Sequence, residues 1–464
     1  MLNIHRLVQQ VIRIKIEEQN IEEVILRKVL KLFNKGSVVS KNVDHAISAW
    51  NYSSKYIELV KDFFYLTNYI SVELIDSARY EEAYLIGLKV SELLSALPSD
   101  NLNVISGLIT THNNIAGALL KQGKYGIALK AFQEVFHTQK AIFGSNHPQT
   151  IDIQNNIALA LFKQGKYNEA LKYYHEILDI SKIMLGESHS RTLSIKHSIA
   201  GTLLSQGKYD EALRMLQEIY CIQETVLGGN HSETLKTKNS IATALSYQGK
   251  FDEALQMFQE IHKIQEGTLK KNHPSILLAK NNIAGLFLTQ GKYSDAYQVY
   301  QEVLNTEKEV LGENHPNVLG TQRHVAEILR IQGKYDKALE IFQEIFDKQK
   351  DSLGSNHPDV LDTQYSKAQT LDTLGKLSDA LRVYEEVLSK KKLILGNYHP
   401  STLKVRNSIA IILSKHGEYD TALQHYREIL NIENSSLGEN HPDTLATKNN
   451  MGMIWLSIGC IKRT

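Results

Sequence analysis

The sequence predicts an all-α fold, a superhelical solenoid built from antiparallel helix pairs. The first observation behind this prediction is periodicity: the tripeptide Gly-Lys-Tyr, or a close variant of it, recurs every 42 residues from Gly123 to Gly417. The second is that apolar residues on both sides of each glycine are three or four positions apart, which is the spacing of one helix face. A length of 464 residues would otherwise suggest several globular domains, but internal repeats indicate one quasi-linear array.

Each repeat contains two expected helices joined by a tight turn. Before the first glycine, Ile115 and Leu119 fall on one helical face, which we expect to be buried. Gly123 allows the left-handed backbone conformation that ends a helix and reverses the chain. After it, the small side chain of Ala128 lets the second helix approach the first closely. The unit is therefore helix, turn, helix and loop.

A histidine follows each second helix, from His147 to His441, and it often precedes proline. Proline suits the first turn of a helix, so the next first helix is expected to begin here. Successive histidines are separated by a whole repeat, whereas ligands of one metal ion must converge. We therefore expect these histidines to cap helices and predict no metal site.

The periodicity predicts four segments. Residues 1–50 form an N-terminal helical segment, and residues 51–107 form a degenerate helical repeat that acts as a cap. Residues 108–443 hold eight repeats of 42 residues, and residues 444–464 hold the first helix of a truncated final repeat. Because a lone hairpin cannot bury its apolar stripe, each repeat must pack against its neighbours.

The repeats resemble tetratricopeptide repeats, in which Ile115, Leu119 and Ala128 would stand at the helix-packing positions. The usual period of that family is about 34 residues. The longer form seen at residues 281–284 (Asn-Asn-Ile-Ala) and 311–316 (Leu-Gly-Glu-Asn-His-Pro) resembles the 42-residue subclass of kinesin light chains and nephrocystin-3-like proteins. This resemblance implies a protein-protein interaction scaffold that binds an extended partner segment in its concave groove, as in a kinesin light chain-like cargo adapter.

The same resemblance implies kinesin heavy chain as a partner. Kinesin light chains pair with it through a long N-terminal heptad region, and residues 1–50 are too short and irregular to supply one. Residues 4–9, Ile-His-Arg-Leu-Val-Gln, are instead similar to the end of the winged-helix segment of NB-ARC-type signalling NTPases. That resemblance implies the alternative function of a ligand-sensing or autoinhibitory repeat tail lacking its nucleotide-binding module.

Composition and motifs exclude several classes of function. Lys and Arg total 52 against 51 Asp and Glu, so the charge of +1 gives no basic surface for nucleic acid. No apolar run approaches the roughly 20 residues of a membrane helix. The two cysteines, Cys221 and Cys460, form no disulfide framework, which favours a cytoplasmic location. No phosphate loop or catalytic constellation stands out, so we predict no enzyme activity and no cofactor.

Asparagine recurs ten residues before the glycine of most repeats, at a helix position that faces the concave groove in tetratricopeptide arrays. Asparagine is a poor choice for a helix interior, so this repetition needs another reason. Either the amides bridge adjacent repeats, or they bind the backbone of a partner. The sixth repeat differs, because its basic residues form either a site for an acidic or phosphorylated partner or a solvated charge cluster. The candidate partner-binding residues are Asn113, Asn114, Asn155, Asn156, Asn239, Asn281, Asn282, Arg323, His324, Arg330, Asn407 and Asn449.

Overall fold

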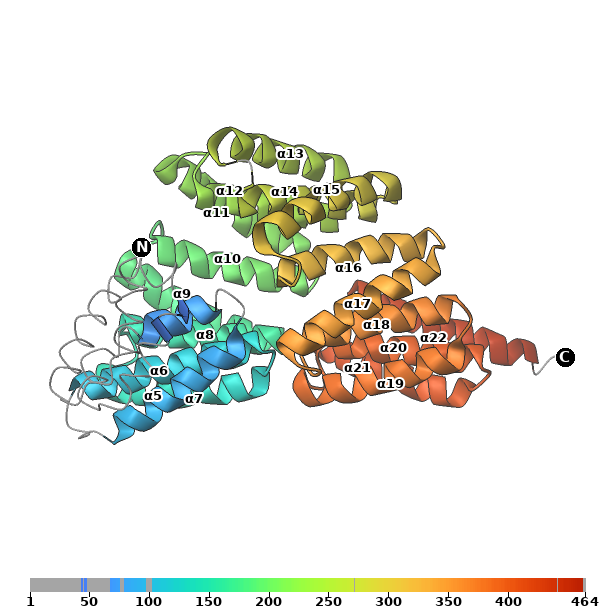
Figure 1. The fold of residues 1–464 in the computed structure, drawn as a ribbon, viewed down its shortest axis with the longest axis horizontal. Helices are drawn as coiled ribbons and strands as arrows, with labels where there is room; N and C mark the ends of the chain where they lie inside the picture. The colour runs from blue at the N-terminus through green and yellow to red at the C-terminus, as the bar shows by residue number, and fades with distance from the viewer. Residues whose placement is uncertain are drawn as a thin grey trace, which may run out of the picture. The chain divides into compact units, whose positions relative to one another are not determined.

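The computed structural model describes residues 43–44, 46–47, 67–75, 79–96, 102–270, 272–439 and 441–461. Within these ranges the regular structure is entirely helical, which confirms the predicted all-α class (Figure 1). The expected N-terminal segment lies almost wholly outside the described residues, and so does the Ile-His-Arg-Leu-Val-Gln motif. No described helix combines the length and apolarity needed to cross a bilayer.

The helices follow one another in pairs of first and second helices, with α22 after the last pair. Before them, residues 67–75 are also helical. The bounds are α5 Tyr80–Ser95, α6 Leu102–Lys121, α7 Tyr125–Phe143, α8 Pro148–Lys163, α9 Tyr167–Leu185, α10 Ser190–Ser205, α11 Tyr209–Leu227, α12 Ser232–Tyr247, α13 Phe251–Thr268, α14 Pro274–Thr289, α15 Tyr293–Leu311, α16 Pro316–Ile331, α17 Tyr335–Leu353, α18 Pro358–Thr373, α19 Leu377–Ile394, α20 Pro400–Lys415, α21 Tyr419–Ser436 and α22 Pro442–Ile461.

The chain divides into two compact units, residues 1–160 and 161–464, and α8 crosses the boundary. In the first unit α5 packs on α6 and α6 on α7. In the second unit each helix from α9 to α22 packs on the next. The division into an N-terminal segment, a cap, eight repeats and a truncated repeat remains a prediction.

The hairpins form where the sequence predicts them because the special residues take up their expected geometry. Gly291 ends the turn after α14 with a positive φ of 73°, a conformation that disfavours any residue with a Cβ. Ala296 is fully buried on α15, five residues later, where it packs in one core with Tyr300 and Ala284 of α14. Five of the second helices, α7, α9, α11, α15 and α17, also end at a glycine, such as Gly312 with a φ of 84°.

The histidines of the loops cap the first helices, as predicted. In His315, the ring Nδ1 accepts a hydrogen bond of 3.2 Å from the backbone nitrogen of Asn317. The same bond recurs at all eight loop histidines, from His147 to His441. Each bond satisfies one of the amide groups that a helix N-terminus leaves open. Among the described residues, no group of acidic, histidine or cysteine side chains is arranged to hold a metal ion.

Candidate partner-binding groove

Most of the predicted asparagines take part in a ladder of side-chain hydrogen bonds between neighbouring first helices. Each rung joins two residues of successive repeats. The first residue lies ten positions before the glycine of its own repeat, and the second lies nine positions before the glycine of the next repeat. Asn282 Nδ2, for example, donates to Asn239 Oδ1 at 2.6 Å. Further rungs are Asn156 to Asn113 at 3.1 Å, Asn450 to Asn407 at 3.3 Å, His197 with Ser240 at 2.9 Å and Tyr365 with Ser408 at 3.0 Å. Asn114 donates in the same way to Asn68, at 3.0 Å.

The ladder is interrupted at Asn281. The residue that would complete its rung, one repeat after Asn282, is His324, and its ring stacks on Tyr300 with 5.1 Å between the centroids. Asn281 turns toward α15 instead, where its Nδ2 donates to Glu307 Oε1 over a long 3.5 Å. Its Oδ1 atom is buried and accepts no hydrogen bond from any described residue. A ladder amide is thus left with an open acceptor.

Glu307 is the second unusual acceptor. Its side chain is only 3% exposed, and its Oε2 atom has no hydrogen-bond partner within the described part of the chain. Burial raises the pKa of this carboxyl, against hydrogen bonds from the Thr321 hydroxyl and the Asn281 amide. One repeat later the same position holds the neutral Gln349, whose Oε1 accepts a bond of 2.7 Å from Thr363. The fifth repeat therefore carries a buried acid where its neighbour has an amide.

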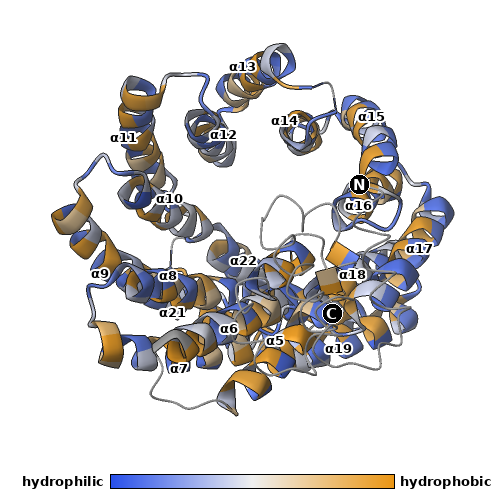
Figure 2. Ribbon diagram, turned by 60° about the vertical axis from the view of Figure 1, so that its left-hand side comes forward, coloured by the Kyte–Doolittle hydropathy of each residue, from blue (hydrophilic) through white to orange (hydrophobic). Residues whose placement is uncertain are grey.

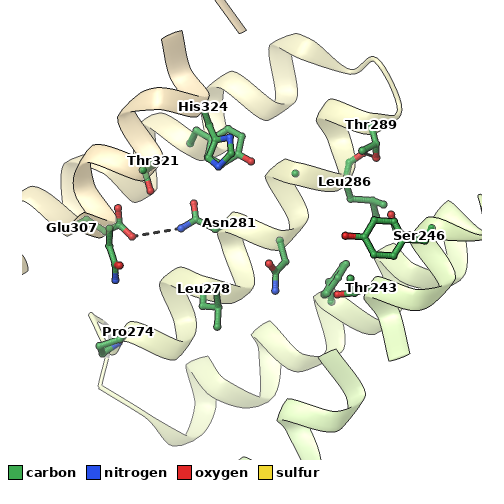
Figure 3. A pocket seen from close by; sticks show the side chains of 17 residues that line it. Thr243, Ser246, Pro274, Leu278, Asn281, Leu286, Thr289, Glu307, Thr321 and His324 are labelled. Atoms are coloured by element: carbon green, nitrogen blue, oxygen red, sulfur yellow. Dashed lines mark hydrogen bonds between the residues drawn. The ribbon is translucent and has the colours of Figure 1, made fainter. Parts of the chain in front are cut away.

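Both open oxygens belong to residues that line one cavity of about 530 Å³ (Figure 3), which we call the acceptor pocket. Figure 3 shows Asn281 and Glu307 pointing toward each other, joined by their hydrogen bond, with Thr321 and His324 on the adjoining helix. The pocket is lined by Thr243, Ser246, Tyr247, Phe258, Pro274, Leu278, Asn281, Asn282, Gly285, Leu286, Thr289, Tyr300, Glu307, Asn317, Gly320, Thr321 and His324. These residues come mainly from α12, α14 and α16, which lie on the inner side of the local curve, with α11, α13 and α15 outside (Figure 2).

The size of the pocket follows from small residues on two helices. A Cβ added at Gly320 would meet nothing within 4 Å, and one added at Gly285 would only touch the Tyr300 hydroxyl. The position of Gly320 holds Leu278 in the preceding repeat. Leu278 itself is 57% exposed on the pocket rim, as is Tyr247 at 58%. The lining of the pocket therefore combines exposed apolar side chains with the buried carboxyl group of Glu307.

The charge of the pocket rests on one group. His324 also lines it, but burial and then the charge of Arg323 lower the pKa of His324 to about 4, so its imidazole is neutral at pH 7. None of the other described residues that line the pocket is a lysine, arginine or acid. Among these described residues, Glu307 is thus the only one that can carry a full charge at neutral pH.

The predicted basic site of the sixth repeat is divided by the structure. Arg330 Nη2 donates to Glu327 at 2.5 Å, so its charge is neutralised locally. Arg323 is half-buried and lines a second cavity of about 630 Å³ together with Glu327 and Asp362. The charges there are mixed rather than basic, because the lining holds Lys391 and Lys404 together with Glu327, Asp362, Glu433 and Asp443.

The remaining predicted residues do not converge on either cavity in one cluster. Asn155 is half-buried on α8, and Asn449 is exposed on α22. Asn407 lines the second cavity while it accepts its ladder bond. Glu307 was not among the residues predicted from the sequence. The signal that could have identified it is the glutamate itself, because several other repeats have glutamine at this position.

The helix pairs, their caps and their inner face define a helical-repeat protein. A family model described as tetratricopeptide repeat matches residues 107–183, 191–267, 275–344 and 317–392, and two further models of the same description match 402–443 and 240–309. These matches cover more than half of the chain, which therefore belongs to the tetratricopeptide repeat family. Repeats of this family typically form scaffolds for protein-protein interaction, and this chain is a protein-interaction scaffold.

Solved structures show similar folds. A Rap protein complexed with Competence and Sporulation Factor superposes with a TM-score of 0.52, at 14% identity, over 82% of this chain and 99% of that one. A putative kinesin light chain from Podosopora anserina with TPR-like repeats is 25% identical over 43% of this chain and 94% of that one, with a TM-score of 0.37. The apo quorum sensor NprR from B. thuringiensis is 14% identical over 78% of this chain and 99% of that one, with a TM-score of 0.48. No curated protein matches the sequence.

Proposed function

We propose that the inner face of α12, α14 and α16 binds an extended segment of a partner protein. The observation that carries the proposal is the interrupted ladder. The buried Oδ1 atom of Asn281 accepts no hydrogen bond from the described residues, whereas Asn239 Oδ1 accepts a ladder bond from Asn282. A buried polar atom without a partner is costly, and a main-chain N–H of an extended segment would satisfy it. The exposed Tyr247 and Leu278 offer apolar contacts beside it.

The biological role that we favour is that of a cargo adapter similar to kinesin light chains. Its support is the 42-residue repeat form and a groove suited to an unfolded segment. The alternative is the repeat tail of a signalling NTPase, which residues 4–9 favour by their similarity to the end of a winged-helix segment. Genomic sequence upstream of the first codon discriminates between them: a phosphate-loop coding region supports the tail, and a long heptad region supports the adapter.

The groove can be tested without knowing the partner. The full chain is panned against a phage library of random dodecapeptides, and an enriched peptide is then bound to chains that carry a photo-crosslinking phenylalanine analogue. We expect crosslinks from position Leu278 on the pocket rim and none from Ile183, an 87% exposed residue of α9. Enrichment with crosslinks only at Ile183, or no enrichment, would contradict groove binding.

A further inference from the structure

We infer that the acceptor pocket takes a basic side chain, lysine or arginine, of the bound segment. This inference rests on the proposed function, since it assigns the chemistry of one residue of the segment that the groove holds. Its starting point is Glu307, a residue that is only 3% exposed and has no basic side chain among the described residues that line the pocket around it.

The two open atoms are both acceptors. Asn281 Oδ1 and Glu307 Oε2 are buried without hydrogen-bond partners in the described part of the chain, while Glu307 Oε1 already receives the Asn281 amide at 3.5 Å. An ammonium group has three donors and a guanidinium group five, and neither has an acceptor. A side-chain head that carries only donors therefore matches Glu307 Oε2, beside the main-chain N–H that Asn281 Oδ1 accepts, whereas a carboxylate or a phosphate would meet oxygen against oxygen.

Charge argues in the same direction. A buried carboxylate is stabilised by an opposite charge and destabilised by burial alone. In the free protein the burial of Glu307 favours its neutral form, and an arriving cation would favour the ionised form again. Because His324 is neutral at pH 7, no cation among the lining residues competes for the carboxylate.

The shape of the pocket suits a long basic side chain. The methylene stem of lysine or arginine packs along apolar surface while its charged head seeks polar groups. Here the exposed rings and methyls of Tyr247 and Leu278 lie at the rim, and Glu307 lies inside. Tyr247 also offers an aromatic face of the kind on which a cation stacks. Gly320, on α16, leaves the space that a larger residue would occupy.

Two substitutions separate charge from space. Glu307→Gln removes the charge and installs the residue that the next repeat carries at Gln349, so the helix packing should be retained. Gly320→Leu fills the pocket with the residue found at Leu278, and it leaves Glu307 unchanged. The matched control is Glu433→Gln, the same exchange at the same repeat position, at a residue that lines the second cavity rather than the acceptor pocket.

The experiment pans the random dodecapeptide library on the full wild-type chain and on each variant. We expect wild-type and Glu433→Gln chains to enrich peptides with one recurrent lysine or arginine, and Glu307→Gln to enrich peptides without it. For an enriched peptide, replacing the basic residue by norleucine should weaken binding to the wild type about tenfold or more and to Glu307→Gln by less than about twofold. Gly320→Leu should weaken the basic peptide and leave the thermal midpoint unchanged or higher.

The outcomes distinguish the two proposals. Enriched peptides with no basic preference, or a basic preference that survives Glu307→Gln, would overturn the inference while leaving groove binding in place. No enrichment on the wild-type chain would overturn both. A norleucine effect of equal size on the wild type and on Glu307→Gln would also place the basic residue elsewhere in the groove and contradict the inference.

Discussion

Asn282 Nδ2 on α14 donates a 2.6 Å hydrogen bond to Asn239 Oδ1 on α12, one repeat earlier, whereas Asn281 has no corresponding bond to His324. Asn239 and Asn281 occupy the same position of successive repeats and have different roles. Asn239 links two repeats, and Asn281 presents an open acceptor to the groove. The sequence analysis left the bridging and ligand-binding interpretations open, and the structure shows that the ladder exists.

Loss of the rung should destabilise the second unit locally. Asn239→Ala removes the acceptor of Asn282 Nδ2 and should lower the opening free energy of α12 and α14 by about 1 to 2 kcal/mol. Native-state hydrogen exchange measures this, because repeat arrays open locally. Asn281→Ala is the matched control and should have a smaller effect, since its only bond is 3.5 Å long. Equal losses would contradict the difference between the two residues.

Lys391 provides a test of buried charge. Its side chain is 1% exposed, it pairs with Asp362 at 2.5 Å, and burial lowers its pKa. Asp362→Ala would leave the ammonium without its counter-ion and should lower the unfolding free energy by about 3 to 5 kcal/mol. Lys391→Gln installs the residue seen at Gln349 and should cost less. Urea denaturation compares the two, and a larger loss for Lys391→Gln would contradict the account.

Glu433 should make stability depend on pH. Burial raises its pKa from 4.5 to about 7, with the Thr447 hydroxyl opposing this rise and Asp443 adding to it. A raised folded-state pKa means that the stabilisation is complete below about pH 4.5, falls as the pH increases and is lost above about pH 7. Glu433→Gln should therefore be more stable than the wild type at pH 8, by roughly 1 to 3 kcal/mol, and equal to it near pH 4.5.

Urea denaturation across that pH range measures the effect of Glu433. The control is Glu439→Gln, an exposed glutamate of the following loop, which should leave the profile unchanged. If the unfolding free energies of the wild type and of Glu433→Gln differed by the same amount at every pH from 4.5 to 8, Glu433 would not be the source of the pH dependence.

The two predicted arginines should differ in what their loss affects. Arg323→Ala should weaken binding of a hexaglutamate peptide, mainly at low ionic strength, because its charge faces a cavity. Arg330→Ala should instead lower stability, by about 1 kcal/mol or more, since it leaves Glu327 without its 2.5 Å partner. Fluorescence anisotropy in low and high salt measures the first effect. A stronger loss of binding in Arg330→Ala, with stability unchanged, would reverse the assignment.

The repeating features could be predicted from the sequence because each depends on local chemistry. Gly291 needs a positive φ, Ala296 needs close helix contact, and His315 caps the helix that starts after it. The first helix of the first repeat runs from Leu102 to Lys121, and α22 begins at Pro442.

The site was harder to predict because it depends on pairs of residues in different repeats. The availability of Asn281 is decided by His324, which prefers to stack on Tyr300 rather than complete a rung. Glu307 matters because it is buried. The sequence shows a glutamate where several other repeats have glutamine, but it does not show that this position lies inside the protein. The sequence also does not show that Arg330 forms an ion pair with Glu327, one helical turn away on the same helix.

The central claim is that the open amide of Asn281 holds the main chain of a bound segment. The most direct measurement is isothermal titration of one library-enriched dodecapeptide into the wild type, Asn281→Ala and Asn239→Ala. The account predicts that Asn281→Ala weakens binding by about 1 to 3 kcal/mol, because a peptide group then loses its buried partner, while Asn239→Ala leaves the affinity of the folded chain unchanged. Full affinity in Asn281→Ala, with the loss confined to Asn239→Ala, would contradict it.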